Sequence, residues 1–385
     1  MTTSLHYLDH AAATPVDEKV LAAMLPYQSE FFFNPSSPYA PAVKVRRKYE
    51  EAKARLARTF GARGDEIIIT AGATESINLA FASVEGHVVV SAIEHDAVLG
   101  AASAREHTFV TPTEKGMITA EAVKSAIRET TVLVSVQLAN NEIGTVQPIR
   151  DIAEVIRAER KRRADEADDR PIYLHCDGSQ GFGQIDVNVA RLGIDLLTLN
   201  AGKMYGPKQM GLLWAKPGVR LKPLINGGGQ ERGIRSGTEN VAGTIGFALA
   251  AELAYDRRKF EAERLSALRD RLEETLRSEL PDMLVTGNPK RRLPGSLHVS
   301  LPGLDGERLV FALESRGVLV ATGSACAANK GTRSHVLTAM GLPDEVADGS
   351  LRMTLGRLSD EEAITQAAAA IIDVVRHEYA RVGHA

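Results

Sequence analysis

The stretch IDLLTLNAGKMYGPKQMGLLW, residues 194–214, decides the expected fold. It contains two largely apolar runs, residues 195–200 and 211–216, and the turn between them delivers the amine of Lys203. Short runs that are apolar on both faces are typical of strands in a mostly parallel sheet covered by helices. Turns normally carry small or polar residues that face water. A lysine that directly follows a buried strand therefore needs a chemical explanation.

The same pattern extends toward the N-terminus. Four more strand-like runs occur at residues 65–70, 87–92, 131–139 and 171–177, and helical patterns occur at 74–85, 119–129 and 149–169. This alternation predicts an α/β fold with a mostly parallel sheet. We expect a large domain over residues 16–260 and a small α+β domain over residues 1–15 and 261–385, joined by a helical pattern from about residue 240 to 280.

Composition narrows the classes of function. The 385 residues carry a net charge of −3 with a pI near 6.4, so no basic surface is expected for nucleic acid or for a membrane. The first fifteen residues lack the charged-then-apolar layout of a signal peptide. With only two cysteines, a disulfide framework is not expected, and we expect the protein to be cytoplasmic. No metal is expected.

Polar residues follow the predicted strands. In open α/β sheets, ligands bind at the carboxyl ends of the strands. Ala73 and Thr74 begin a helix whose N–H groups can hold an anion, although an ordinary helix cap explains them equally well. His95 also stands near a helix start, where a capping role is the simpler alternative, and Asn141 follows the run 131–139.

The next two strand ends complete a set of complementary groups. Asp177 and Gln180 follow the run 171–177, and a buried carboxylate such as Asp177 requires a cation or a strong donor. This inventory matches pyridoxal phosphate: Lys203 would bind the aldehyde, Asp177 the pyridine nitrogen, and the helix start the phosphate. Desolvation would lower the pKa of Lys203 and free its amine.

The two cysteines differ in setting. Cys176 lies inside the run 171–177, where alternation turns it away from a ligand at the strand end, so we expect a packed, inert thiol. Cys326 lies in ATGSACAANKGTRS, residues 321–334. The small and polar residues there indicate an exposed loop in which a thiol can ionise.

Many motifs, in order, resemble one family. The sequence contains YLDHAAATPVD, FNPSSP, GATES, EHDAVL, NNEIGTVQPI, HCDGSQ, GKMYGPK, GGGQERGIRSGTEN, ATGSACA, SHVLTAMG and LRMTLGR. It resembles the cysteine desulfurases of the iron–sulfur-assembly and nitrogen-fixation type, which are class-V aminotransferases. The resemblance implies a fold-type-I pyridoxal-phosphate enzyme with a seven-stranded sheet, which forms a homodimer.

The resemblance also implies a role for each matching residue. Lys203, His95 and Cys326 would be catalytic, and Asn34 and Arg357 would bind the substrate carboxylate. The cofactor would be held by Ala73, Thr74, His95, Asn141, Asp177, Gln180, Lys203 and, from the neighbouring subunit, Thr238. Many members carry Ser-Gly-His before the lysine, whereas this chain has Asn200, Ala201 and Gly202. We expect a hydrogen bond from Asn200 and only a backbone contact from Gly202.

The implied reaction converts L-cysteine to L-alanine and passes the sulfur, as a persulfide on Cys326, to an acceptor protein. That acceptor could serve iron–sulfur cluster assembly, tRNA thiolation or DNA phosphorothioation. Because few residues follow the last predicted helix, we expect a dedicated acceptor rather than a general scaffold. A selenocysteine lyase or another class-V aminotransferase is the alternative within the fold, and a non-catalytic partner subunit is the alternative outside it.

Overall fold

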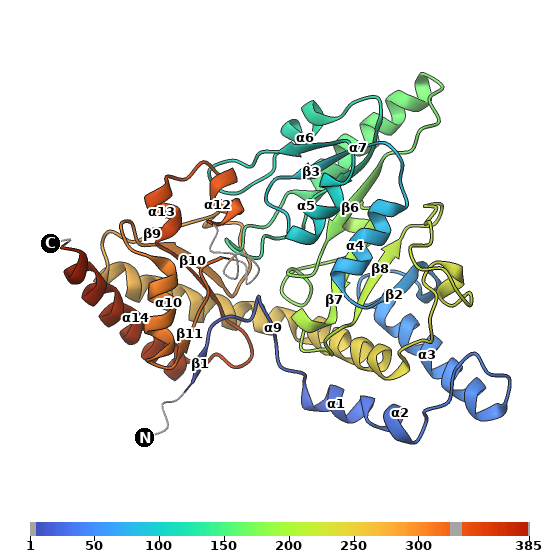
Figure 1. Cartoon of the computed structure of the whole chain (residues 1–385), viewed down its shortest axis with the longest axis horizontal. Coiled ribbons are helices and arrows are strands. Elements are labelled where there is room, and N and C mark those ends of the chain that lie inside the picture. The colour runs from blue at the N-terminus through green and yellow to red at the C-terminus, as the bar shows by residue number, and fades with distance from the viewer. Residues whose placement is uncertain (1–4, 324–332, 384–385) are drawn as a thin grey trace.

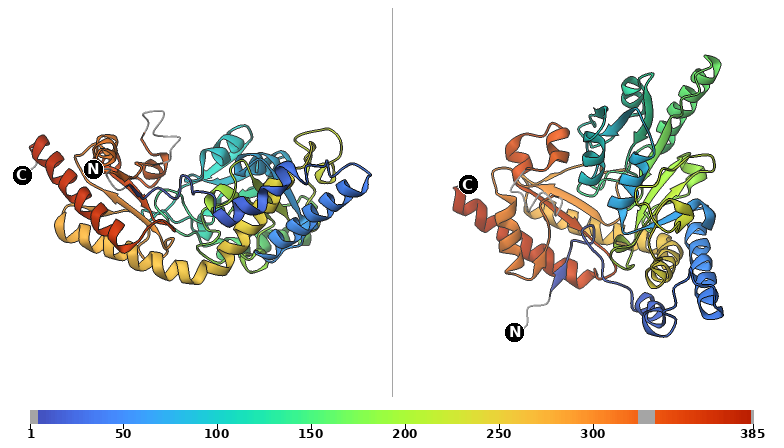
Figure 2. Two further views of the ribbon diagram at one scale, coloured as in Figure 1. Left: turned by 90° about the horizontal axis from the view of Figure 1, so that it is seen from below. Right: turned by 45° about the vertical axis from the view of Figure 1, so that its right-hand side comes forward.

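Two units joined by one long helix make up the structure, a computed structural model that describes residues 5–323 and 333–383. Figure 1 shows the larger unit around a twisted sheet, with the smaller unit beside it. Figure 2 shows helix α9 (Val241–Glu279) running beneath both. Helix α9 supplies Ala248 and Ala251 to the core of the larger unit and Leu268 and Leu272 to the core of the smaller one. The domain boundary expected at residue 260 falls inside this helix and stays a prediction.

The larger unit contains a seven-stranded sheet with the order β2-β8-β7-β6-β5-β3-β4. Its strands are β2 (Ile67–Thr70), β3 (His87–Ser91), β4 (His107–Val110), β5 (Thr131–Ser135), β6 (Tyr173–Asp177), β7 (Leu196–Asn200) and β8 (Gly211–Ala215). All neighbours pair in parallel except those of β8, which is antiparallel to both β2 and β7. The mostly parallel α/β sheet predicted from the sequence is therefore confirmed.

Helices cover both faces of this sheet. The helices of this unit are α1 (Glu18–Met24), α2 (Pro26–Ser29), α3 (Ala40–Arg58), α4 (Ala73–Ala82), α5 (Asp96–Ser103), α6 (Ala120–Ala126), α7 (Ile149–Asp165), α8 (Val189–Leu192) and the first part of α9, against which α1 and α2 pack. Successive residues of each strand point to opposite faces. Ile68 accordingly packs with α4 and α5, whereas Ile67 and Ile69 pack with α3 and α9. Burial on both faces explains why the inner strands of the sheet are largely apolar.

Among the described residues, the smaller unit contains two short sheets and four helices in addition to the second part of α9. Strands β12 (Ser350–Thr354), β10 (Ser296–Ser300) and β9 (Leu284–Val285) form an antiparallel sheet, and β1 (His6–Tyr7) pairs in parallel with β11 (Val318–Leu319). The helices are α10 (Gly306–Glu314), α12 (His335–Ala339), α13 (Asp344–Asp348) and α14 (Glu361–Val382). Strand β1 therefore ties the N-terminus to the C-terminal third of the chain (Figure 1).

Three details differ from the sequence-based expectations. Edge strand β4 was not predicted, because only one of its four residues is buried and the run lacks an apolar signature. Strand β5 ends at Ser135, four residues before the expected end of the run 131–139. Helix α7 ends at Asp165 rather than near residue 169, since the charged residues that follow can be solvated without a helix.

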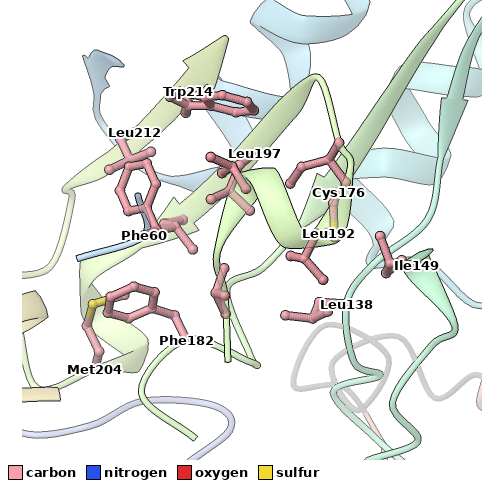
Figure 3. Packing of buried hydrophobic residues seen from close by; sticks show 14 of the residues in the cluster. Phe60, Leu138, Ile149, Cys176, Phe182, Leu192, Leu197, Met204, Leu212 and Trp214 are labelled. Carbon is pink, nitrogen blue, oxygen red and sulfur yellow. The ribbon is translucent and has the colours of Figure 1, made fainter. Parts of the chain in front are cut away.

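Cys176 is a packed thiol, as predicted. It is fully buried, and Figure 3 shows it among Leu138, Ile149 and Leu192. Burial raises the pKa of its thiol well above the ordinary value, and the nearby carboxylates of Asp177 and Glu94 act in the same direction. Such a thiol ionises poorly, so Cys176 is a core residue and not a nucleophile.

Candidate functional site

The carboxyl ends of the parallel strands meet at one cavity of about 270 Å³. It is lined by Ala11, Ala12, Ala73, Thr74, His95, Gln137, Ala139, Asn141, Asp177, Ser179, Gln180, Asn200, Lys203 and Arg352. Eight of the residues expected at the site from the sequence are therefore brought together: Ala73, Thr74, His95, Asn141, Asp177, Gln180, Asn200 and Lys203. They come from the ends of five different strands, which only the folded sheet places side by side.

Lys203 projects into this cavity from the short helical turn Ala201–Lys203 that follows β7. Its Nζ donates hydrogen bonds to the carbonyl oxygens of Ala11 at 2.7 Å and Ala12 at 2.6 Å. The pKa of the Lys203 amine is lowered to about 8, mainly by burial and then by the positive charge of Arg352, while Asp9 and Asp177 act in the opposite direction. A lysine in this state supplies a neutral amine near physiological pH.

The start of α4 provides an anion cradle. The first N–H groups of a helix have no partner within the helix and attract negative charge. Gly72 precedes the helix with φ 143°, a backbone angle that only glycine adopts without strain. A Cβ on Gly211 would lie 2.5 Å from the carbonyl carbon of Gly72, so β8 packs directly against this turn. The turn that presents Ala73 and Thr74 is therefore supported by the backbone of β8.

His95 caps α5 and lines the cavity at the same time. Its Nδ1 accepts the N–H of Ala97 at 3.1 Å, so a neutral ring carries its proton on Nε2. His95 therefore has the capping role that the sequence offered as the simpler alternative. The capping hydrogen bond also holds the ring in the lining of the cavity. The preceding residue, Glu94, is fully buried, and its Oε1 accepts the N–H of Gln137 at 2.7 Å. Burial raises the pKa of Glu94 well above its ordinary value.

The amides and the carboxylate occupy distinct positions. Asp177, at the end of β6, accepts the N–H of Ser179 at 2.9 Å through Oδ1. Gln180 Nε2 donates to the carbonyl oxygen of Ala11 at 3.1 Å. Asn200 Oδ1 accepts the N–H of Gly202 at 3.0 Å. The N–H of Gly202 is therefore already bonded, and Gly202 does not line the cavity, so its expected backbone contact with a cofactor stays a prediction.

The arginine in the cavity is Arg352, which sequence reasoning missed. Its side chain is 2% exposed, and Nη2 donates to Asp9 Oδ1 at 2.6 Å. Arg357, the residue expected from the sequence, lines a neighbouring cavity of about 60 Å³. There it lies 4.0 Å from the ring centre of Tyr205, and Nη1 contacts Asp17 Oδ2 at 2.9 Å. The available signal for Arg352 was a charged residue inside the otherwise apolar stretch SLRMTL, residues 350–355.

Two further residues expected at the site lie away from the cavity in this chain. Asn34 is exposed on the segment after α2, and its Oδ1 accepts the N–H of Ser36 at 2.9 Å. Thr238 is exposed just before α9. Its expected contact was with the cofactor of a neighbouring subunit, so its position in one chain leaves that role a prediction.

Cys326 lies outside the described residues. Residues near both ends of the undescribed segment 324–332 meet at the buried carboxylate of Glu142. Ser334 Oγ donates to Glu142 Oε2 at 2.5 Å, and a Cβ on Gly323 would lie 3.2 Å from the same oxygen. Glu142 directly follows Asn141, so Gly323 and Ser334 lie beside the cavity wall.

Two negative findings concern the described ranges alone. Within residues 5–323 and 333–383, no three His, Cys, Asp or Glu side chains gather as a metal ion would require. In those same ranges, no helix combines the length and the apolar character needed to cross a membrane.

Comparison with known proteins places the chain in a family. Residues 6–366 match the class-V aminotransferase family. The cysteine desulfurase IscS 1 of Archaeoglobus fulgidus is 42% identical over 93% of this chain and 94% of its own length. A NifS-like protein of known structure superimposes with a TM-score of 0.88 at 30% identity, over 97% of this chain and 100% of that one. The structure of SspA in complex with cysteine superimposes with a TM-score of 0.77 at 35% identity, over 91% of this chain and 98% of that one. The chain is therefore a member of the class-V aminotransferase family.

Proposed function

We propose that this protein is a cysteine desulfurase that converts L-cysteine to L-alanine and moves the sulfur to an acceptor. The observation that carries the proposal is the amine of Lys203, whose pKa is about 8, in one cavity with Asp177, His95 and Arg352. The cysteine desulfurase relatives, about 40% identical over 93% of the chain, support the same activity.

Pyridoxal phosphate is the cofactor of this family, and the cavity fits it. The free amine of Lys203 suits the aldehyde, the carboxylate of Asp177 suits the pyridine nitrogen, and the N–H groups of Ala73 and Thr74 suit the phosphate. His95 would lie against the ring, while Asn141, Gln180 and Asn200 supply hydrogen-bonding groups to its substituents. When bound, the cofactor draws electron density away from Cα of the amino acid.

The protein's own groups perform the proton transfers. Lys203, as a neutral amine, accepts the proton from Cα of the amino acid. The resulting ammonium group then donates this proton to another atom in the cavity. The Nε2–H of His95 offers a second proton donor in the same cavity. We assign the substrate carboxylate to Arg352 in place of Arg357. Lys203 lines both cavities, but Arg352 shares its cavity with Asp177 and His95 as well, whereas the cavity of Arg357 contains neither. The guanidinium of Arg357 is also stacked on Tyr205 and paired with Asp17.

Sulfur transfer requires Cys326. The thiolate of Cys326 attacks the substrate sulfur, so an S–S bond forms while the substrate C–S bond breaks. The electron pair of that C–S bond stays with the three-carbon fragment, which takes up a proton and leaves as alanine. The sulfur remains on Cys326 as a persulfide until an acceptor thiol or protein removes it.

A homodimer is part of the proposal. Large apolar side chains are exposed along α1, α2 and the start of α3, including Leu25 and Phe32 at 67% each. Exposed apolar area of this kind marks interaction surfaces. The exposed Thr238 precedes Glu239, which pairs with Arg46 of α3 at 2.9 Å. The sulfur passes to an acceptor protein. That acceptor would serve iron–sulfur cluster assembly, tRNA thiolation or DNA phosphorothioation.

One experiment tests the activity and the rival functions together. L-cysteine alone is added to the holoenzyme, and alanine, sulfide and the mass of the Cys326 peptide are measured. Stoichiometric alanine with one added sulfur on Cys326 supports the proposal. An aminotransferase would form no alanine without a 2-oxo acid, and a selenocysteine lyase would prefer selenocysteine by orders of magnitude. Protein that stays colourless with added pyridoxal phosphate would indicate a non-catalytic subunit.

A further inference from the structure

Arg352 is a buried cation that needs a compensating charge. It lies in β12, in the sheet of the smaller unit, and its side chain is 2% exposed. A guanidinium withdrawn from water is costly unless a carboxylate pairs with it. Asp9 provides that carboxylate, with its Oδ1 2.6 Å from Nη2 and its side chain 18% exposed. Within the part of the chain that the structure describes, Arg352 Nε has no hydrogen-bond partner.

The ion pair with Asp9 occupies only one nitrogen of the guanidinium. Nη2 is bonded to Asp9, whereas Nη1 is only 3.4 Å from the carbonyl oxygen of Asn141, a long and weak contact. Asn141 and Arg352 line the cavity, and Asp9 does not. Asp9 therefore pairs with the guanidinium from outside the cavity lining, and Nη1 is left with only the weak contact to Asn141.

Asp9 also belongs to the segment that holds Lys203. The carbonyl oxygens of Ala11 and Ala12 accept hydrogen bonds from Lys203 Nζ, two and three residues after Asp9. One short turn, closed by the N–H of Ala12 on the carbonyl oxygen of Asp9 at 3.0 Å, thus contacts both cations of the cavity. The separation of amine and guanidinium is fixed by this turn.

We propose that Asp9 is a positioning residue that sets the specificity of the site for an α-carboxylate, by orienting Arg352 relative to Lys203. An α-amino acid carries its amino group and carboxylate on the same carbon, so the two cations must be held at one separation to engage both. Asp9 touches neither substrate nor cofactor and acts through Arg352. This inference rests on the proposed function, since it assigns the carboxylate to Arg352.

The test compares a substrate that has the carboxylate with an amine that lacks it. In the Asp9→Asn holoenzyme, the side-chain shape is kept and the charge is lost. KM for L-cysteine should rise about tenfold to one-hundredfold with a smaller change in kcat. The affinity for cysteamine, read from the change in cofactor absorbance, should stay within about twofold. The matched control is Asp17→Asn, which removes the carboxylate beside Arg357 and should leave both values unchanged.

A second readout requires no turnover. In the cofactor-free protein, Asp9→Ala leaves Arg352 buried without its carboxylate and should lower the unfolding temperature, and adding Arg352→Met should recover most of the loss. The inference would be overturned if Asp9→Asn weakened the binding of L-cysteine and cysteamine equally, or if it left KM for L-cysteine unchanged. It would also be overturned if Asp17→Asn raised KM for L-cysteine instead. If wild-type protein forms no alanine, the proposed function itself fails, which is a separate outcome.

Discussion

Covalent capture of pyridoxal phosphate by the cofactor-free protein should follow the ionisation of Lys203. Only the neutral amine attacks an aldehyde. The pKa of Lys203 is lowered from 10.5 to about 8, mainly by burial and then by Arg352. At pH 7 the neutral fraction is therefore about one tenth, against about one in three thousand for an ordinary lysine, a gain of roughly 300-fold.

The assay mixes cofactor-free protein with pyridoxal phosphate between pH 7 and 10 and follows the absorbance of the covalent adduct. The rate should rise about fivefold from pH 7 to 8 and level off above pH 9, with a midpoint near 8. Nα-acetyllysine provides the reference, with a midpoint near the ordinary value. Arg352→Gln should move the protein's midpoint upward, because Arg352 lowers the pKa of Lys203. A wild-type midpoint near 10.5 would refute the argument that burial activates this amine.

Three further changes test other parts of the structure. Cys326→Ala should keep the cofactor absorbance and lose alanine formation from cysteine; normal turnover would contradict the persulfide step. Cys176→Ser places a hydroxyl in an apolar cluster and should lower the free energy of unfolding by about 1–3 kcal/mol in urea titrations, with activity per folded molecule unchanged. Gly211→Ala should displace the Gly72 turn, because the added Cβ would lie 2.5 Å from the backbone of Gly72. Inorganic phosphate should then compete less well with the cofactor for the site. Unaltered phosphate binding would show that this turn is not the anion cradle.

The sequence predicted those site residues that directly follow buried strands. Asp177, Lys203 and His95 share this property, because the carboxyl ends of parallel strands meet at one edge whatever the strand order. Each could be recognised as a polar residue at or just after the end of an apolar run. Local pattern was sufficient here because strand and functional side chain are adjacent in the chain.

Arg352 could not be found in that way. It lies in the middle of β12, in the smaller unit, and enters the cavity only because α9 and the N-terminal segment hold the two units together. Arg357, five residues later, carries the same charge in the same motif, so the sequence alone gave no physical reason to choose between them. Edge strand β4 was missed for a related reason: its half-exposed residues carry no apolar run.

The measurement that most directly tests the central claim is borohydride reduction of the holoenzyme followed by peptide mass analysis. The account predicts that the pyridoxyl group is fixed to Lys203 and that Lys208, five residues away in the same loop, is unlabelled. Labelling of another lysine, or of none, would contradict it.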